Sequence, residues 1–163
     1  MISQPAGPVF ARRLPWLFTY YCRIIVEFGI RGNYIVDAMA DSPMGSRFVI
    51  QEHTTPQGVH WDLMIERGDA LTTFRLAGSP ESAADHPVEA TRIADHPLRF
   101  LTYEGPVQKG TGHVRIVDRG DYTIWDERDD ALSLRFRGTI LQGRFTLVRV
   151  EDSTWQLALG EDG

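Results

Sequence analysis

Alternation of apolar and polar residues with a period of two, from residue 47 onward, restricts the folds open to this chain more than any other feature. It is clearest over residues 47–53 and 59–66, and the Thr-Thr-Pro-Gln-Gly between them is typical of a turn. Successive side chains of a strand point to opposite faces. We therefore expect a hairpin here, with one face of each strand in a core and the other lining a site.

Further short segments of the same kind follow, separated by turn residues, and no convincing helix appears after residue 44. Residues 81–90 are expected to form a loop or one short helical turn. The economical solution is a mainly all-β fold, a small closed or nearly closed antiparallel β-barrel, because closure leaves no exposed strand edges. The other expected strands are 71–76, 91–94, 98–103, 113–118, 122–125, 132–137, 144–150 and 155–159, with turns at 119–121, 126–130 and 142–143.

The 163 residues are enough for one domain. The only cysteine, Cys22, excludes an internal disulfide and a cysteine-based zinc site, which favours a cytoplasmic protein. A net charge of −5 argues against a protein that follows a long phosphate backbone. Sixteen of the 17 basic residues are arginine, the side chain suited to bidentate contact with one phosphate. We expect a monomer.

Residues 1–43 differ in character from the rest. An Arg-Arg pair precedes the apolar run 14–22, but Arg23 and Glu27 soon interrupt it and no clean cleavage site follows. The run is too short and too charged to span a membrane. We predict an N-terminal extension over 1–43, either disordered or an upstream translation artefact with Met39 or Met44 as the true start, and a barrel domain over 44–163.

Two of the five histidines fall in the first predicted hairpin. His53 and His60 lie on neighbouring strands, near enough to be cross-strand partners. His60 and Asp62 are two residues apart, so they share a face with Cα atoms roughly 6.6 Å apart. Two imidazoles and a carboxylate are a ligand set for a divalent ion such as Mn, Zn or Fe. The alternative is a hydrogen-bonded polar patch without a metal.

Six short motifs follow one another along the strand-rich part of the chain: Arg-Phe-Val-Ile-Gln-Glu-His at 47–53, His-Trp-Asp-Leu at 60–63, Asp-His-Pro-Leu at 95–98, Tyr-Glu-Gly at 103–105, Val-Asp-Arg-Gly at 117–120 and Leu-Gln-Gly-Arg-Phe-Thr-Leu-Val-Arg at 141–149. They occur in the order seen in the 3′-phosphoesterase domain of bacterial DNA ligase D, and about residues 47–159 resemble that family. The resemblance implies a small β-barrel that trims nucleic-acid 3′ ends by removing a terminal ribonucleoside and then the 3′-phosphate, with manganese as the favoured metal.

The resemblance implies that His53, His60 and Asp62 bind a divalent metal, most simply manganese, with zinc or another divalent ion as an alternative. It also implies that His96 is catalytic and contacts the scissile phosphate, where it could protonate the leaving oxygen. The expected partner is a DNA or RNA–DNA 3′ end in DNA repair. A DNA ligase or polymerase on a separate chain is a further candidate partner.

The chain departs from the family where the family carries phosphate-binding side chains. Met64 stands for an arginine, Gly78 for a lysine, Val88 for an arginine and Phe100 for a tyrosine. Each lost charge-assisted contact could cost about 1.5–3 kcal/mol of substrate binding. Arg75 and Arg92, on adjacent predicted strands, are candidate replacements for phosphate binding.

Two other functions stay open. The missing cations favour a metal-dependent module that binds nucleic-acid ends with weak or no turnover. The spacing of His60 and Asp62, with a distal His113 and with Arg119, also imitates the ligand set of non-haem iron oxygenases, which are likewise all-β.

Overall fold

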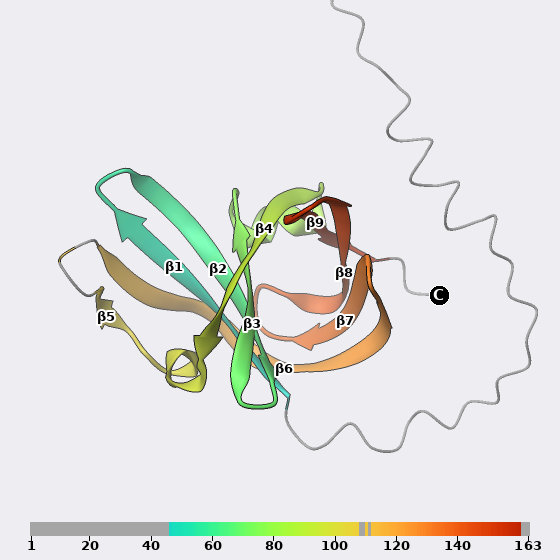
Figure 1. Cartoon of the computed structure of the whole chain (residues 1–163), viewed down its shortest axis with the longest axis horizontal. Coiled ribbons are helices and arrows are strands. Elements are labelled where there is room, and N and C mark those ends of the chain that lie inside the picture. The colour runs from blue at the N-terminus through green and yellow to red at the C-terminus, as the bar shows by residue number, and fades with distance from the viewer. Residues whose placement is uncertain (1–45, 108–109, 111, 161–163) are drawn as a thin grey trace, which may run out of the picture. The chain divides into compact units, whose positions relative to one another are not determined.

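The computed structural model describes residues 46–107, 110 and 112–160, and these form strands with two short 3-10 helices (Figure 1). Among them no helix reaches seven residues, and none is long and apolar enough to cross a membrane. The elements are β1 (Arg47–Thr55), β2 (Gly58–Arg67), β3 (Ala70–Leu76), η1 (Pro80–Ala84), β4 (Val88–Pro97), η2 (Leu98–Leu101), β5 (Gly105–Pro106), β6 (His113–Arg128), β7 (Ala131–Arg137), β8 (Gln142–Glu151) and β9 (Thr154–Leu159).

The strands close into an eight-stranded antiparallel barrel, which confirms the predicted fold class. Their order is β1-β2-β3-β4-β9-β8-β7-β6, and β6 pairs back onto β1 to close the sheet. The two-residue β5 adds to the other edge of β6 near its start. Figure 1 shows the ends of β1 and β2 projecting together from one side, while β6 curves from that side around to β7.

One core fills the inside of the barrel, and all eight strands contribute to it. Phe48 and Phe136 meet edge-to-face there, with ring centroids 4.7 Å apart. Burying each such side chain stabilises the fold by roughly 1.5–3 kcal/mol relative to exposure. The buried members are Phe48, Ile50, Leu63, Ile65, Phe74, Leu76, Ala83, Val88, Ala90, Tyr122, Leu132, Leu134, Phe136, Leu141, Phe145, Leu147 and Leu157.

A second, smaller core lies on the outer face of the barrel. Val49, Met64 and Leu71, from β1, β2 and β3, are fully buried under Leu101 of η2. Gln51 fixes this cover, since its Nε2 donates to the carbonyls of Phe100 and Tyr103 at 2.8 Å each. The expectation that the second face of β2 lines a site is therefore only half right, because Met64 on that face is core.

The predicted turn at 119–121 is wrong, because β6 runs unbroken through these residues. Gly120 pairs with Phe48, and a Cβ on it would lie 2.1 Å from the Arg137 carbonyl oxygen. The glycine therefore permits a close approach of two backbones within the sheet. The turn expected over 126–130 is correspondingly shorter, since the strand continues to Arg128.

The turn predicted at 142–143 lies instead at 138–141, and β8 already begins at Gln142. Buried Asp118 explains this position. Its carboxylate accepts hydrogen bonds from the amides of Thr139, Ile140 and Leu141 at 2.8–3.1 Å. A Cβ on Gly138 would lie 2.6 Å from Asp118 Oδ2, so only glycine fits beside that carboxylate. One buried charge thus sets the β7–β8 connection.

Two other expectations change between β3 and β5. Residues 98–103 are not extended, because Leu98–Leu101 forms η2 and turns its apolar side chains onto the outer face. The strand expected at 91–94 is longer and spans Val88–Pro97. The short helical turn expected within 81–90 is η1. The predicted extension over 1–43 lies outside the described residues and stays a prediction.

Candidate metal centre

The β1–β2 register brings the three predicted metal ligands together, as the hairpin pattern indicated. His53 is the direct partner of His60, and Gln51 is the partner of Asp62. Because the neighbouring residues Val49 and Met64 face outward, His53, His60 and Asp62 share that outer face, near the tip of the hairpin. The candidate centre therefore lies on the outside of the barrel wall.

Within this cluster three ligand atoms lie within 4.8 Å of one another. His53 Nδ1 is 3.1 Å from His60 Nε2, and His60 Nε2 is 3.7 Å from Asp62 Oδ2. The two imidazole rings meet edge-to-face with centroids 4.7 Å apart. Asp62 is only 7% exposed, so its carboxylate is held in a largely buried position.

Both imidazoles are driven towards the neutral form that binds metals. Burial is the main cause that lowers the pKa of His53, and the Arg75 charge lowers it further, while Asp62 opposes the shift. Burial likewise lowers the pKa of His60, again opposed by Asp62 and assisted by Arg75 and His53. Near neutral pH both rings therefore offer lone pairs instead of a positive charge.

The donor set fits a divalent metal. With metal–nitrogen bonds of about 2.1 Å, two nitrogens would lie about 3.0 Å apart at 90° and about 3.4 Å apart at the tetrahedral angle. The 3.1 Å between the two histidine nitrogens falls within this range. His53 Nε2 is buried and has no hydrogen-bond partner among the described residues, so Nδ1 is the nitrogen that this ring offers to a ligand.

Arg75 orients the carboxylate of the cluster. Its Nε donates to Asp62 Oδ1 at 2.9 Å and its Nη2 contacts Asp62 Oδ2 at 3.3 Å. The two residues are partners in the β2–β3 register, so Arg75 lies on the same outer face. Its side chain is 42% exposed, which leaves part of the guanidinium accessible to a substrate beside the cluster.

His96 also lies on the outer face, but it is not part of the ligand cluster. Its Nδ1 is 3.0 Å from Thr73 Oγ1, and that hydroxyl donates its single proton to the Leu71 carbonyl. The tautomer that satisfies both contacts is the one in which His96 Nδ1–H donates to the hydroxyl oxygen. Nε2 is then the ring atom left for a substrate.

Arg92 and His113 do not join this group. Arg92 pairs with Phe74, whose ring belongs to the inner core, so it lies on the opposite face of the sheet from Asp62. Its guanidinium sits over the Phe74 ring and contacts Asp95. His113 pairs with Thr54 and is exposed. Its neighbour Val114 pairs with His53, so His113 points to the opposite face of the sheet from the cluster.

The sequence interpretation missed three residues that support the site. Gln51 anchors η2 beside it and Thr73 contacts His96 Nδ1, and both are in phase with predicted site residues on their strands. Gly112 approaches His53 closely, since a Cβ there would lie 3.0 Å from His53 Nε2 and 2.2 Å from the Thr54 carbonyl oxygen. The period-two alternation of the strands could have identified Gln51 and Thr73. The contact of Gly112 with His53 joins segments far apart in the sequence, so no local pattern predicts it.

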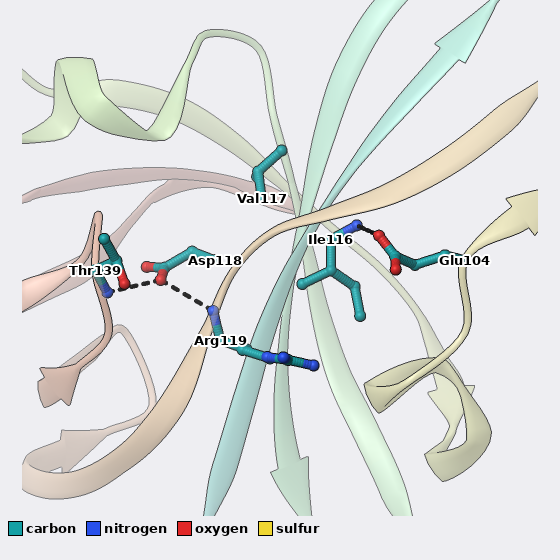
Figure 2. Close-up of a pocket in the computed structure, with 6 residues that line it drawn as sticks. All are labelled: Glu104, Ile116, Val117, Asp118, Arg119 and Thr139. Atoms are coloured by element: carbon teal, nitrogen blue, oxygen red, sulfur yellow. Dashed lines mark hydrogen bonds between the residues drawn. The ribbon is translucent and has the colours of Figure 1, made fainter.

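A shallow pocket of about 240 Å³ lies elsewhere on the barrel, over β6 (Figure 2). Glu104 reaches it from one side and accepts a hydrogen bond from the Ile116 amide at 2.8 Å. Asp118 and Thr139 form its other side. None of the three cluster residues lines it, so the candidate metal centre is not part of this pocket.

Fold and site together define a class, a small antiparallel barrel with a His-His-Asp cluster on its outer wall. The chain belongs to the DNA Ligase D 3′-phosphoesterase domain family, whose model matches residues 51–149. This result confirms the family to which the motifs pointed.

The chain is also similar to two proteins that are much longer than it is. The Multifunctional non-homologous end joining protein LigD of Mycolicibacterium smegmatis is 30% identical over 124 residues, which cover 67% of this chain and 16% of the relative. The protein of the same name from Pseudomonas aeruginosa is 29% identical over 131 residues, covering 72% of this chain and 15% of the relative. The chain thus spans about one sixth of the length of these relatives.

Proposed function

We propose that this chain is a metal-dependent 3′-phosphoesterase that removes a phosphate or a terminal ribonucleoside from nucleic-acid 3′ ends. One observation carries the proposal: in a member of this family, His53, His60 and Asp62 present three ligand atoms within 4.8 Å on an accessible outer face. The names of the relatives support a role in DNA end joining, where a DNA ligase would seal the cleaned end.

Each residue of the site has a separate task. His53, His60 and Asp62 would hold a divalent ion, which supplies Lewis acidity towards a phosphoryl oxygen and lowers the pKa of a bound water. Arg75 keeps the Asp62 carboxylate oriented and offers its exposed edge to the substrate phosphate. His96, with the proton on Nδ1, offers Nε2 to the scissile phosphate, where a protonated ring could pass its proton to the leaving oxygen.

Manganese is the ion we propose first. A mixed nitrogen and oxygen site with open positions accepts manganese, zinc or iron, so the donor set restricts the ion without selecting one. The family resemblance favours manganese among them.

A catalytically weak end-binding module is the second candidate, and the packing of the substituted positions favours it. Met64 is 1% exposed beneath η2, and Val88 belongs to the inner core. Phe100 packs on the outer core with its ring 5.3 Å from that of His96. At three positions where the family places polar groups, this chain therefore has packed apolar side chains. Among the residues that the structure describes, Arg75 supplies the cationic side chain that contacts the cluster.

The oxygenase alternative has no comparable support. It requires His113 beside His60 and Asp62, but His113 alternates away from the cluster face. Its distal ligand is therefore missing.

A metal screen on a primer-template with a 3′-phosphate or a 3′-ribonucleotide separates the two remaining candidates. The esterase releases phosphate in the presence of manganese, and His96→Ala loses this turnover while it keeps metal binding. A module without catalysis binds the metal and the 3′ end but releases nothing with any ion. Phosphate release that persists in a His60→Ala/Asp62→Ala double variant would refute the metal assignment.

A further inference from the structure

We propose that the outer face of β6, β7 and β8 binds an unpaired nucleic-acid strand, with Trp125 as a stacking platform and arginines along the phosphates. This surface does not include the candidate metal centre, and its binding does not require the hydrolysis proposed above.

Trp125 is the most exposed of the large hydrophobic side chains in the described chain, at 60%. It is the extra residue of a bulge, because Ile124 pairs with Leu134 while Asp126 pairs with Ser133. Bulges re-aim side chains out of the regular alternation. The bulge therefore presents the indole ring of Trp125 to solvent, where the ring is available to stack with a ligand.

Arg144 stacks on this tryptophan and is itself held in place. Its guanidinium lies 5.2 Å from the Trp125 ring centroid. Gly160 packs against the Arg144 side chain, since a Cβ on this glycine would lie 3.2 Å from Arg144 Cγ and Nε. The Gly160 amide also donates to the Arg144 carbonyl at 2.7 Å. A preformed Trp–Arg pair loses little conformational freedom when a ligand binds.

The strand register places several arginines on the same face of the sheet as the Trp125–Arg144 pair. Asp121 pairs with Arg137, Thr123 with Arg135, and Arg135 with Arg144, all on the face opposite the inner core. Arg119 lies two residues before Asp121 on β6, on the same face, and also lines the pocket (Figure 2). The same register places Asp126 and Arg128 on this face, where they form an ion pair, so five arginines share it with two aspartates in a chain of net charge −5. The acidic β6–β7 turn marks the end of this basic face.

A polyanion with exposed aromatic groups suits such a face better than a protein partner. Arginines pair with phosphates in bidentate geometry, and bases stack on exposed aromatic rings without sequence preference. In a duplex the bases are already stacked and their faces are covered. The occupant should therefore be single-stranded.

β6 also relates this surface to the candidate metal centre. Val114 pairs with His53, and Trp125 follows eleven residues later on the same strand. At 3.3 Å per residue the path along β6 is at most about 36 Å. A stacked strand that rises about 3.4 Å per nucleotide would need on the order of ten nucleotides to cover it.

The test measures binding of single strands of about 16 nucleotides, as DNA and as RNA, and of a blunt duplex of that length, all with 3′-hydroxyl ends and in a metal chelator. Trp125→Ala should weaken single-strand binding by about 5- to 100-fold, and Trp125→Phe should restore most of it. Arg137→Gln should reduce the slope of log affinity against log salt by about 0.7. The better-bound single strand identifies DNA or RNA as the ligand.

Arg149→Gln is the matched control. Arg149 is also on β8 and also lies over a tryptophan, with its guanidinium 6.0 Å from the Trp155 ring, but Trp155 packs against the inner core. This variant should bind like the wild type. The proposal is overturned if the wild type binds no single strand, if it prefers the duplex, or if Trp125→Ala and Arg137→Gln both bind like the wild type. These binding results do not depend on phosphate release, so the proposed phosphoesterase activity can fail while the single-strand site stands.

Discussion

The substitution Asp62→Asn tests metal binding with little effect on folding, because the amide keeps the shape of the side chain and removes its charge. In the metal-free protein the change weakens the contact with Arg75, whose side chain is 42% exposed and can be solvated instead. The expected loss is below about 1 kcal/mol. The 112 described residues imply an unfolding entropy of about 0.24 kcal/mol/K, so the melting temperature should fall by no more than about 4 °C.

Metal binding should respond far more strongly. In the wild type an ion at 100 times its dissociation constant adds about 2.7 kcal/mol, or about 11 °C by the same entropy. Asp62→Asn should lose most of this shift for manganese and zinc, as measured by differential scanning calorimetry. Asp69→Asn, in the exposed β2–β3 turn, is the matched control and should keep it. An Asp62→Asn protein that keeps the full metal shift would refute the ligand assignment.

The folded pKa values of His53 and His60 lie below the unfolded value, so the unfolded chain binds more protons as pH falls below about 6.5. Metal-free stability should drop between pH 7.5 and 5.5 in thermal melts, and less so in a His53→Gln/His60→Gln variant; equal slopes would contradict this. His96→Ala should keep the metal-induced melting shift and lose turnover, and unchanged turnover would exclude a catalytic role. Gly112→Ala should weaken metal affinity by about 10- to 100-fold in a titration, because its Cβ would press on His53 and Thr54; wild-type affinity would show that this contact does not position the ring.

The candidate site was more predictable than its surroundings. A turn centred on Pro56 and Gln57 fixes the β1–β2 register, and the register alone makes His53 and His60 direct partners. Strand period then places Asp62 on the same face. These inferences need only local sequence, which is why the hairpin and its cluster followed from the pattern.

The outer core could not be predicted in the same way. Alternation shows that Val49 and Met64 point away from the barrel interior, but it does not reveal that η2 folds back over them. That cover depends on contacts between segments about 50 residues apart, such as Gln51 with Phe100. The turn at 119–121 failed for a related reason, because Gly120 serves a contact with a distant strand and not a local reversal.

Phosphate release from a 3′-phosphate primer-template, measured against added manganese, tests the central claim most directly. The account predicts release by the wild type that a chelator abolishes and manganese restores, and no release by His60→Ala, whose melting temperature without metal should stay close to that of the wild type. Equal release by the wild type and by His60→Ala, or no release by the wild type with any divalent ion, would contradict it.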